Sequence, residues 1–151
     1  MTELTLQRAV HDKLSIVPLL EAGTLRVQLL GMCDSFAVKP LGAYLDRVAG
    51  ELVRLGLTCV AIDVTKLTLL NSSSLKQFIT FIRPMKLGES PCKVEFVVDD
   101  ANPWQRRCIA ALVRMCPNAV SVRDVNGEGP GQNPTRQLRR VVPDPVPKRQ
   151  P

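Results

Sequence analysis

The chain has 151 residues, of which 45% are hydrophobic and 23% are charged, and its formal net charge is +6. This length suits one domain with its own core, and the composition is that of an ordinary soluble globular protein. No apolar stretch approaches the roughly 18–20 residues that a membrane-spanning helix needs. The N-terminus is charged and lacks the apolar region of a signal peptide. We therefore expect a cytoplasmic protein.

The last part of the chain, residues 127–151, carries much of the positive charge. It holds five basic and two acidic residues, so it supplies +3 of the net charge, and it contains six of the twelve prolines. This composition predicts a disordered, basic, proline-rich tail after a folded domain that spans residues 1–126. A tail of this kind can bind nucleic acid or an anionic membrane, but its composition favours a solvated extension.

Residue types that support catalysis or metal binding are scarce. The five cysteines form no C-x-x-C pair, and their odd number argues against a disulfide framework and against a zinc site. The single histidine, His11, lies near the N-terminus, which makes a Ser-His catalytic arrangement improbable. We expect no enzyme, no cofactor and no metal ion. Cys33 falls in a predicted loop, where a reactive thiol is possible although nothing nearby favours one.

The spacing of apolar residues predicts alternating strands and helices. The predicted strands span residues 14–20, 24–30, 57–64, 94–98 and 119–123. A first helix has Pro40 in its first turn and stops at Gly56, and a second spans residues 73–82 and ends before Pro84. A third helix follows Asn102, which we expect to be its N-cap. The class is α/β: a small, mostly parallel sheet with an N-terminal hairpin and helices packed against it.

The start of the second helix is the most informative position. A buried strand leads to Asn71, Ser72, Ser73 and Ser74, where the helix begins. A hydroxyl at a helix start can carry a phosphate, because free N–H groups and the helix dipole both favour an anion there. Asn and Ser are also common at helix starts simply as caps, so the motif alone favours capping.

Two segments in the correct order resemble the STAS family, the fold of anti-sigma-factor antagonists. Residues 29–34 read Leu-Leu-Gly-Met-Cys-Asp, which is similar to the family's strand ending in Gly-x-x-Asp before the first helix. Residues 62–75 are similar to the family's hydrophobic strand followed by Asp-Ser-Ser-Gly-Leu at the next helix start. The resemblance covers roughly residues 24–123, and it implies a STAS-like domain.

The resemblance also implies a function and a site. It makes Ser72 the phosphoacceptor of a bacterial partner-switch protein in signal transduction. The unphosphorylated form would bind a serine kinase of the histidine-kinase-like ATPase class, phosphorylation would break that complex, and a PP2C-type phosphatase would reverse it. The residues expected to contact the partner around the phosphoacceptor are Asp34, Asn71, Ser73, Ser74 and Lys76.

The chain departs from the family pattern at two positions. Asn71 stands where the family has aspartate, and Ser74 stands where it has glycine. Asn71 keeps its capping ability and removes a carboxylate that would repel a phosphate. The Asn-Ser-Ser-Ser version also resembles a subgroup related to biofilm-regulating phosphoproteins. The departures leave an alternative open, in which the chain is an unphosphorylated STAS subunit that acts as a scaffold in a transporter or signalling complex. The sequence also leaves open whether the chain forms a homodimer.

Overall fold

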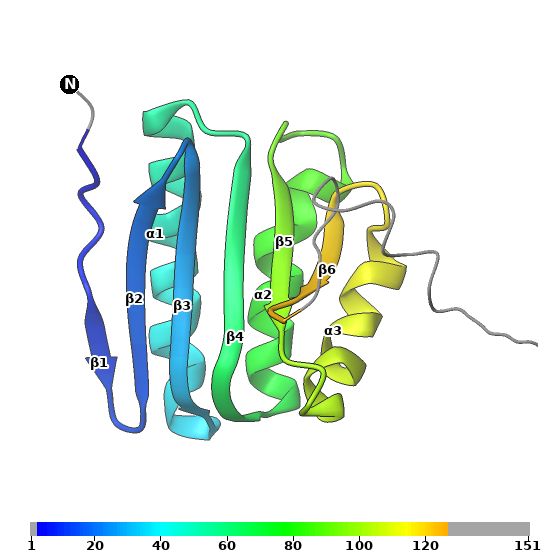
Figure 1. The fold of residues 1–151 in the computed structure, drawn as a ribbon. Coiled ribbons are helices and arrows are strands. Elements are labelled where there is room, and N and C mark those ends of the chain that lie inside the picture. The colour runs from blue at the N-terminus through cyan, green and yellow to red at the C-terminus, as the bar shows by residue number, and fades with distance from the viewer. Residues whose placement is uncertain (1–2, 127–151) are drawn as a thin grey trace, which may run out of the picture.

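The computed structural model describes residues 3–126, which form a mixed β-sheet with helices along one face (Figure 1). The strands are β1 (Ala9–His11), β2 (Leu14–Glu21), β3 (Thr24–Cys33), β4 (Cys59–Leu70), β5 (Lys93–Val98) and β6 (Val120–Asp124). The helices are α1 (Val38–Leu55), α2 (Ser72–Lys86) and α3 (Pro103–Met115), and a 3₁₀ turn, η1 (Ser35–Ala37), precedes α1. The predicted tail, residues 127–151, lies outside the described residues.

The order of strands in the sheet follows the order in the chain. β1, β2 and β3 pair antiparallel, and β3 to β6 pair parallel. Each helical crossover therefore advances by one strand in the same direction. Right-handed crossovers of this kind place every helix on the same side of the sheet, as Figure 1 shows. The predicted class and architecture are confirmed.

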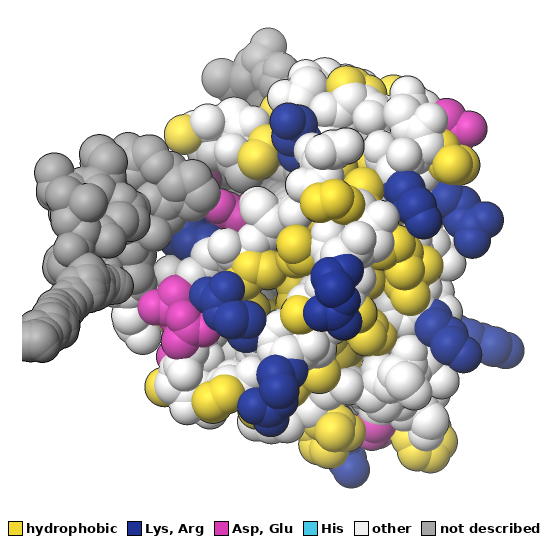
Figure 2. Space-filling model, turned by 90° about the vertical axis from the view of Figure 1, so that its right-hand side faces the viewer, with side chains coloured by type: hydrophobic (Ala, Val, Ile, Leu, Met, Phe, Trp, Pro, Cys, Tyr) yellow, Lys and Arg dark blue, Asp and Glu magenta, His cyan; other side chains and the backbone are white. Residues whose placement is uncertain are grey.

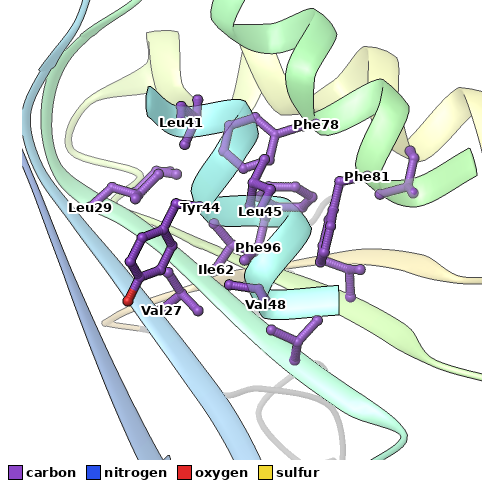
Figure 3. Close-up of a cluster of buried hydrophobic side chains, with 14 of the residues drawn as sticks. Val27, Leu29, Leu41, Tyr44, Leu45, Val48, Ile62, Phe78, Phe81 and Phe96 are labelled. Carbon is purple, nitrogen blue, oxygen red and sulfur yellow. The ribbon is translucent and has the colours of Figure 1, made fainter. Parts of the chain in front are cut away.

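The core lies between this helical layer and the sheet. Every second residue of β3 faces the helices, so Leu25, Val27 and Leu29 are fully buried. In Figure 3 Val27 and Leu29 pack in one cluster with side chains from α1 and α2, and Leu25 belongs to the same core. Phe78 of α2 meets Phe96 of β5 edge to face, with ring centroids 5.5 Å apart. Burial of these alternating apolar side chains is the main stabilising contribution to the fold.

The opposite face of the sheet carries two ion pairs. Asp63 of β4 is only 2% exposed, and it forms an ion pair with Arg26 of β3. The Asp63 carboxylate also accepts hydrogen bonds from the amide and the hydroxyl of Thr65. A second ion pair joins Arg123 of β6 to Glu95 of β5. These bonds satisfy a carboxylate that would otherwise be costly to bury.

The N-terminal segment is ordered along α1, where the sequence predicted little structure. The Tyr44 hydroxyl donates a hydrogen bond to the carbonyl oxygen of Gln7. The amide and hydroxyl of Thr5 donate to the carboxylate of Glu51, which also pairs with Arg54. These contacts hold the segment in place and align β1 beside β2.

Glu51 makes this attachment sensitive to acid. The hydrogen bonds from Arg54 and Thr5 lower the pKa of Glu51 from an ordinary value of 4.5 to about 2. A carboxyl whose folded pKa is depressed stabilises the folded state fully above its unfolded pKa. We therefore expect stability to fall as the pH drops from about 4.5 to about 2. In Glu51→Gln this part of the pH dependence should disappear, which urea denaturation at several pH values will measure. An unchanged acid profile would contradict this assignment.

The strand predicted over residues 57–64 and the helix predicted over residues 73–82 both continue beyond their predicted ends. β4 continues six residues beyond Val64, because its end still pairs with β3 at Met32↔Leu69 and Cys33↔Leu70. Pro84 does not end α2, which runs on to Lys86. The buried side chain of Met85 packs in the core and holds this last turn.

Asn102 is the N-cap position of α3, as predicted, but its side chain makes no capping hydrogen bond. Its backbone does not adopt the extended conformation of a capping residue, since its ψ is 81°. Gly56, in contrast, ends α1 in the left-handed conformation, as predicted. Within residues 3–126 no helix combines the length and the apolar character that crossing a bilayer requires.

Candidate functional site

Ser72 is the first residue of α2, and its side chain is exposed. Asn71 is the N-cap: its side-chain oxygen accepts a hydrogen bond of 2.8 Å from the amide of Ser74. The first helical hydrogen bond runs from the Leu75 amide to the Asn71 carbonyl oxygen, at 3.0 Å. The amides of Ser72 and Ser73 precede this bond, so they are free for an anion at the positive end of the helix dipole. Capping and an accessible hydroxyl therefore occur together here.

The start of α2 is attached to the end of β3 through one carbonyl group. The carbonyl oxygen of Cys33 accepts a hydrogen bond from the Asn71 amide at 3.0 Å and another from the Ser74 hydroxyl at 3.4 Å. Ser74 is fully buried, so the structure does not bring it to the surface with the other predicted contact residues. Where the resembled family has glycine, this serine adds a bond inside the domain.

The Gly-x-x-Asp segment has a structural explanation. Gly31 has a φ of +100°, and a Cβ at this position would lie 2.0 Å from the carbonyl oxygen of Lys13. That oxygen accepts a hydrogen bond from the Met32 amide, so β2 approaches the backbone of β3 closely here. Asp34 is the N-cap of η1, and its carboxylate accepts a 3.0 Å hydrogen bond from the Phe36 amide. Asp34 is half-buried at the same end of the sheet as Ser72.

Two apolar side chains are exposed at the same end of the sheet as the serines. Phe36 of η1 is 74% exposed, and Leu69 near the end of β4 is 39% exposed. η1 contacts both β3 and α2. We call this surface the rim, and it consists of Asp34, Phe36, Leu69, Asn71, Ser72 and Ser73. Sequence analysis missed its apolar part, although an aromatic residue inside a predicted loop was a signal for it.

A positive side chain lies next to the rim, one helical turn after Ser72. Lys76 is exposed and follows Ser72 by four residues, so the two side chains are neighbours on the surface of α2. Lys66 is also exposed but lies on β4, before the end of the strand. Neither lysine forms an ion pair within residues 3–126, so the amine of Lys76 is available to a phosphate on Ser72.

The interpretation of Cys33 as a loop residue is wrong. It is the last residue of β3 and is fully buried. Burial, with a smaller contribution from the charge of Asp34, raises the pKa of the Cys33 thiol to about 12. The thiol therefore stays protonated at neutral pH and is a poor nucleophile. Among the described residues no three His, Cys, Asp or Glu side chains gather closely enough to hold a metal ion.

Neither a protein-family model nor a curated protein matches the sequence. Solved structures do match the fold. An anti-sigma factor antagonist from Mycobacterium paratuberculosis has 20% identity and a TM-score of 0.57, over 73% of this chain and 86% of that one. A chain in the complex of the diguanylate cyclase SiaD with its activator SiaC, from Pseudomonas aeruginosa, has 18% identity and a TM-score of 0.56. That match covers 77% of this chain and 95% of that one.

The unphosphorylated anti-sigma factor antagonist SpoIIAA also matches, with 14% identity and a TM-score of 0.53, over 85% of this chain and 99% of that one. These similarities cover 73% to 85% of this chain and 86% to 99% of the compared chains. The chain therefore has the STAS fold of the anti-sigma factor antagonists.

Proposed function

We propose that this protein is a bacterial partner-switch module, a regulator without catalytic activity that binds another protein through the rim. The proposal rests on one observation: the exposed hydroxyl of Ser72 lies at the start of α2, at the same end of the sheet as the exposed apolar side chains of Phe36 and Leu69. The apolar side chains provide area for a partner to bury. The hydroxyl provides a place where a charge can be added.

Phosphorylation of Ser72 would then control association and leave the fold intact. A phosphate adds about −1.5 to −2 charge at neutral pH. On the free protein it meets the amides of the first helical turn and the amine of Lys76. Within an interface that covers Phe36 and Leu69, the same charge must lose its water or displace the partner. A loss of about 3 kcal/mol weakens binding by more than about a hundredfold.

The partners we propose are a serine kinase of the histidine-kinase-like ATPase class and a PP2C-type phosphatase. The names of the similar structures support binding to other proteins: two are anti-sigma factor antagonists, and one complex pairs a diguanylate cyclase with its activator. The kinase would bind the unphosphorylated rim, modify Ser72 and dissociate, and the phosphatase would restore the binding form.

Substitutions at Ser72 test this proposal. Ser72→Ala, used as bait in cells of the source organism, should retain the partner, whereas Ser72→Asp should bind it at least tenfold more weakly, because its carboxylate places a charge in the interface. Calorimetry with the purified partner measures both affinities, and mass spectrometry locates the phosphate. Ser73→Ala is the matched control, since Ser73 is equally exposed one residue further on. Equal partner affinities for Ser72→Ala and Ser72→Asp would refute the switch.

The alternative of an unphosphorylated scaffold subunit was motivated by Asn71 and Ser74. Asn71 caps α2 as an aspartate would, and Ser74 is buried, so neither departure removes the accessible hydroxyl. We therefore favour the switch. Stable, stoichiometric co-purification with a partner and no phosphate on Ser72 would instead favour the scaffold.

A further inference from the structure

A groove lies at the far edge of the sheet from β1, between β6 and α3. Its volume is about 510 Å³. Its apolar lining is provided by Ala110 and Val113 of α3 and by Val120 and Val122 of β6. The guanidinium groups of Arg106 and Arg114 border it. We call this the β6 groove, and Figure 2 views the molecule from this side, with basic side chains around exposed apolar ones.

The helical layer beside the groove is positively charged. α2 and α3 together carry six basic side chains and no acidic one: Lys76, Arg83, Lys86, Arg106, Arg107 and Arg114. Arg106 forms an exposed ion pair with Asp100 at 2.8 Å. Within residues 3–126, Arg107 and Arg114 form no ion pair. A surface with several unpaired cations attracts segments of negative charge.

β6 also offers backbone groups to a further strand. It pairs with β5 and with no other described strand. The Val94 amide donates to the carbonyl oxygen of Ala119, and the Val125 amide donates to that of Val98. Backbone groups alternate in direction along a strand, so the amide and carbonyl of Val122 point away from β5. An extended peptide can pair with such an edge.

We propose that the β6 groove binds an extended acidic segment of a partner protein by strand addition to β6. Alternate side chains of an added strand point to opposite faces. Apolar side chains of the segment would enter the groove against Val113 and Val122, and carboxylates at the edge of the groove would meet Arg114, which is not engaged in an ion pair as Arg106 is. This interaction is separate from the proposed switch at Ser72.

The charges favour this occupant over three others. A second copy of the chain would bring the arginines of two grooves together, which is repulsive. The chain's own residues 127–151 carry +3 and are repelled in the same way. A membrane surface would be bound by protruding apolar side chains. Here the apolar groups form the floor of a groove, so a narrow peptide fits them better.

Peptide binding to the full chain tests the proposal. The probe is a fluorescent peptide of about nine residues in which valine alternates with glutamate, measured by polarisation at about 0.1 M salt. It should bind, and a peptide with lysine in place of glutamate should not. Arg114→Glu should weaken binding at least tenfold, and higher salt should weaken it too. Lys39→Glu makes the same charge change on α1 and should leave the affinity unchanged, as should Ser72→Asp.

Further measurements distinguish strand addition from non-specific electrostatic attraction. A peptide of the same composition with its glutamates grouped together should bind at least tenfold more weakly. N-methylation of alternate backbone amides in the peptide removes its hydrogen-bond donors along one edge. This change should also weaken binding at least tenfold. Equal binding by either peptide would overturn strand addition. Unchanged affinity of Arg114→Glu, in a protein with unaltered thermal melting, would overturn the site. Binding to phosphatidylglycerol vesicles through Arg114, without peptide binding, would replace the proposal with a membrane contact.

Discussion

Gly31→Ala is expected to lower the free energy of unfolding by about 3 kcal/mol or more. Gly31 has a φ of +100°, a conformation that costs an alanine about 1–3 kcal/mol. The new Cβ would also lie 2.0 Å from the carbonyl oxygen of Lys13, which belongs to the backbone and has no rotamer to adopt. β2 and β3 must therefore separate, and this adds about 1–3 kcal/mol of overpacking.

Urea denaturation followed by circular dichroism measures this loss. Gly50→Ala is the matched control, because a Cβ there meets no heavy atom within 4 Å and lies in the interior of α1. That change should stabilise the protein by up to about 1 kcal/mol, since alanine favours the helix. If both variants unfold at the wild-type urea concentration, the close approach at Gly31 is not as described.

Gln105→Leu is expected to destabilise the protein by a similar amount, about 3 kcal/mol. Gln105 of α3 is 1% exposed. Its side-chain oxygen accepts a hydrogen bond from the Asp99 amide at 2.8 Å. Its side-chain amide donates to the carbonyl oxygens of Thr65 and Leu67, both at 3.3 Å. β4 and β5 no longer pair beyond Asp63↔Val97, so these backbone groups depend on Gln105.

Leucine has a similar size but no polar atoms, and each unsatisfied buried group costs about 1–3 kcal/mol. Gln77→Leu serves as the control: Gln77 is half-buried on α2, and its side chain forms no hydrogen bond within residues 3–126. The control should stay within about 0.5 kcal/mol of the wild type. Equal unfolding midpoints for the two leucine variants would show that Gln105 does not fulfil this role.

Much of the fold could be predicted because its signals are local. The alternation of buried and exposed residues in β3 depends on residues close in sequence. So do the apolar face of α1 and the glycine that ends this helix. The motif around Ser72 was predictable for the same reason, since Asn71 caps a helix by contacting a residue only three positions away.

What the sequence did not reveal depends on contacts between distant segments. The polar pair Thr65-Lys66 looks like the end of a strand, yet the strand continues to Leu70 because β3 lies beside it and extends equally far. β1 is short and forms because β2 and α1 hold the preceding segment. Gln105 is polar, but it precedes Ile109 by four residues and Leu112 by seven, so the helical period places it on the buried face of α3. The hydrogen bonds that it makes to β4 and to Asp99 depend on distant segments, and local patterns do not encode them.

The same reasoning explains the parts of the site that were missed. Phe36 carried a signal, as an aromatic residue inside a predicted loop, but the position of Leu69 is ordinary for an apolar residue, and only the packed domain shows that it remains outside. Ser74 presents the opposite case. It belongs to the motif by sequence, but one helical turn directs it inward to the carbonyl of Cys33.

The connection between α2 and β3 is made by a carbonyl oxygen, a backbone amide and a buried hydroxyl. In the described part of the chain, the exposed side chains of Phe36, Leu69 and Ser73 contribute nothing to it. Substitutions at these three positions would therefore leave the helix start in its place. Under the proposed function, the contacts of the rim can therefore change without loss of stability while Ser72 keeps its place at the start of α2.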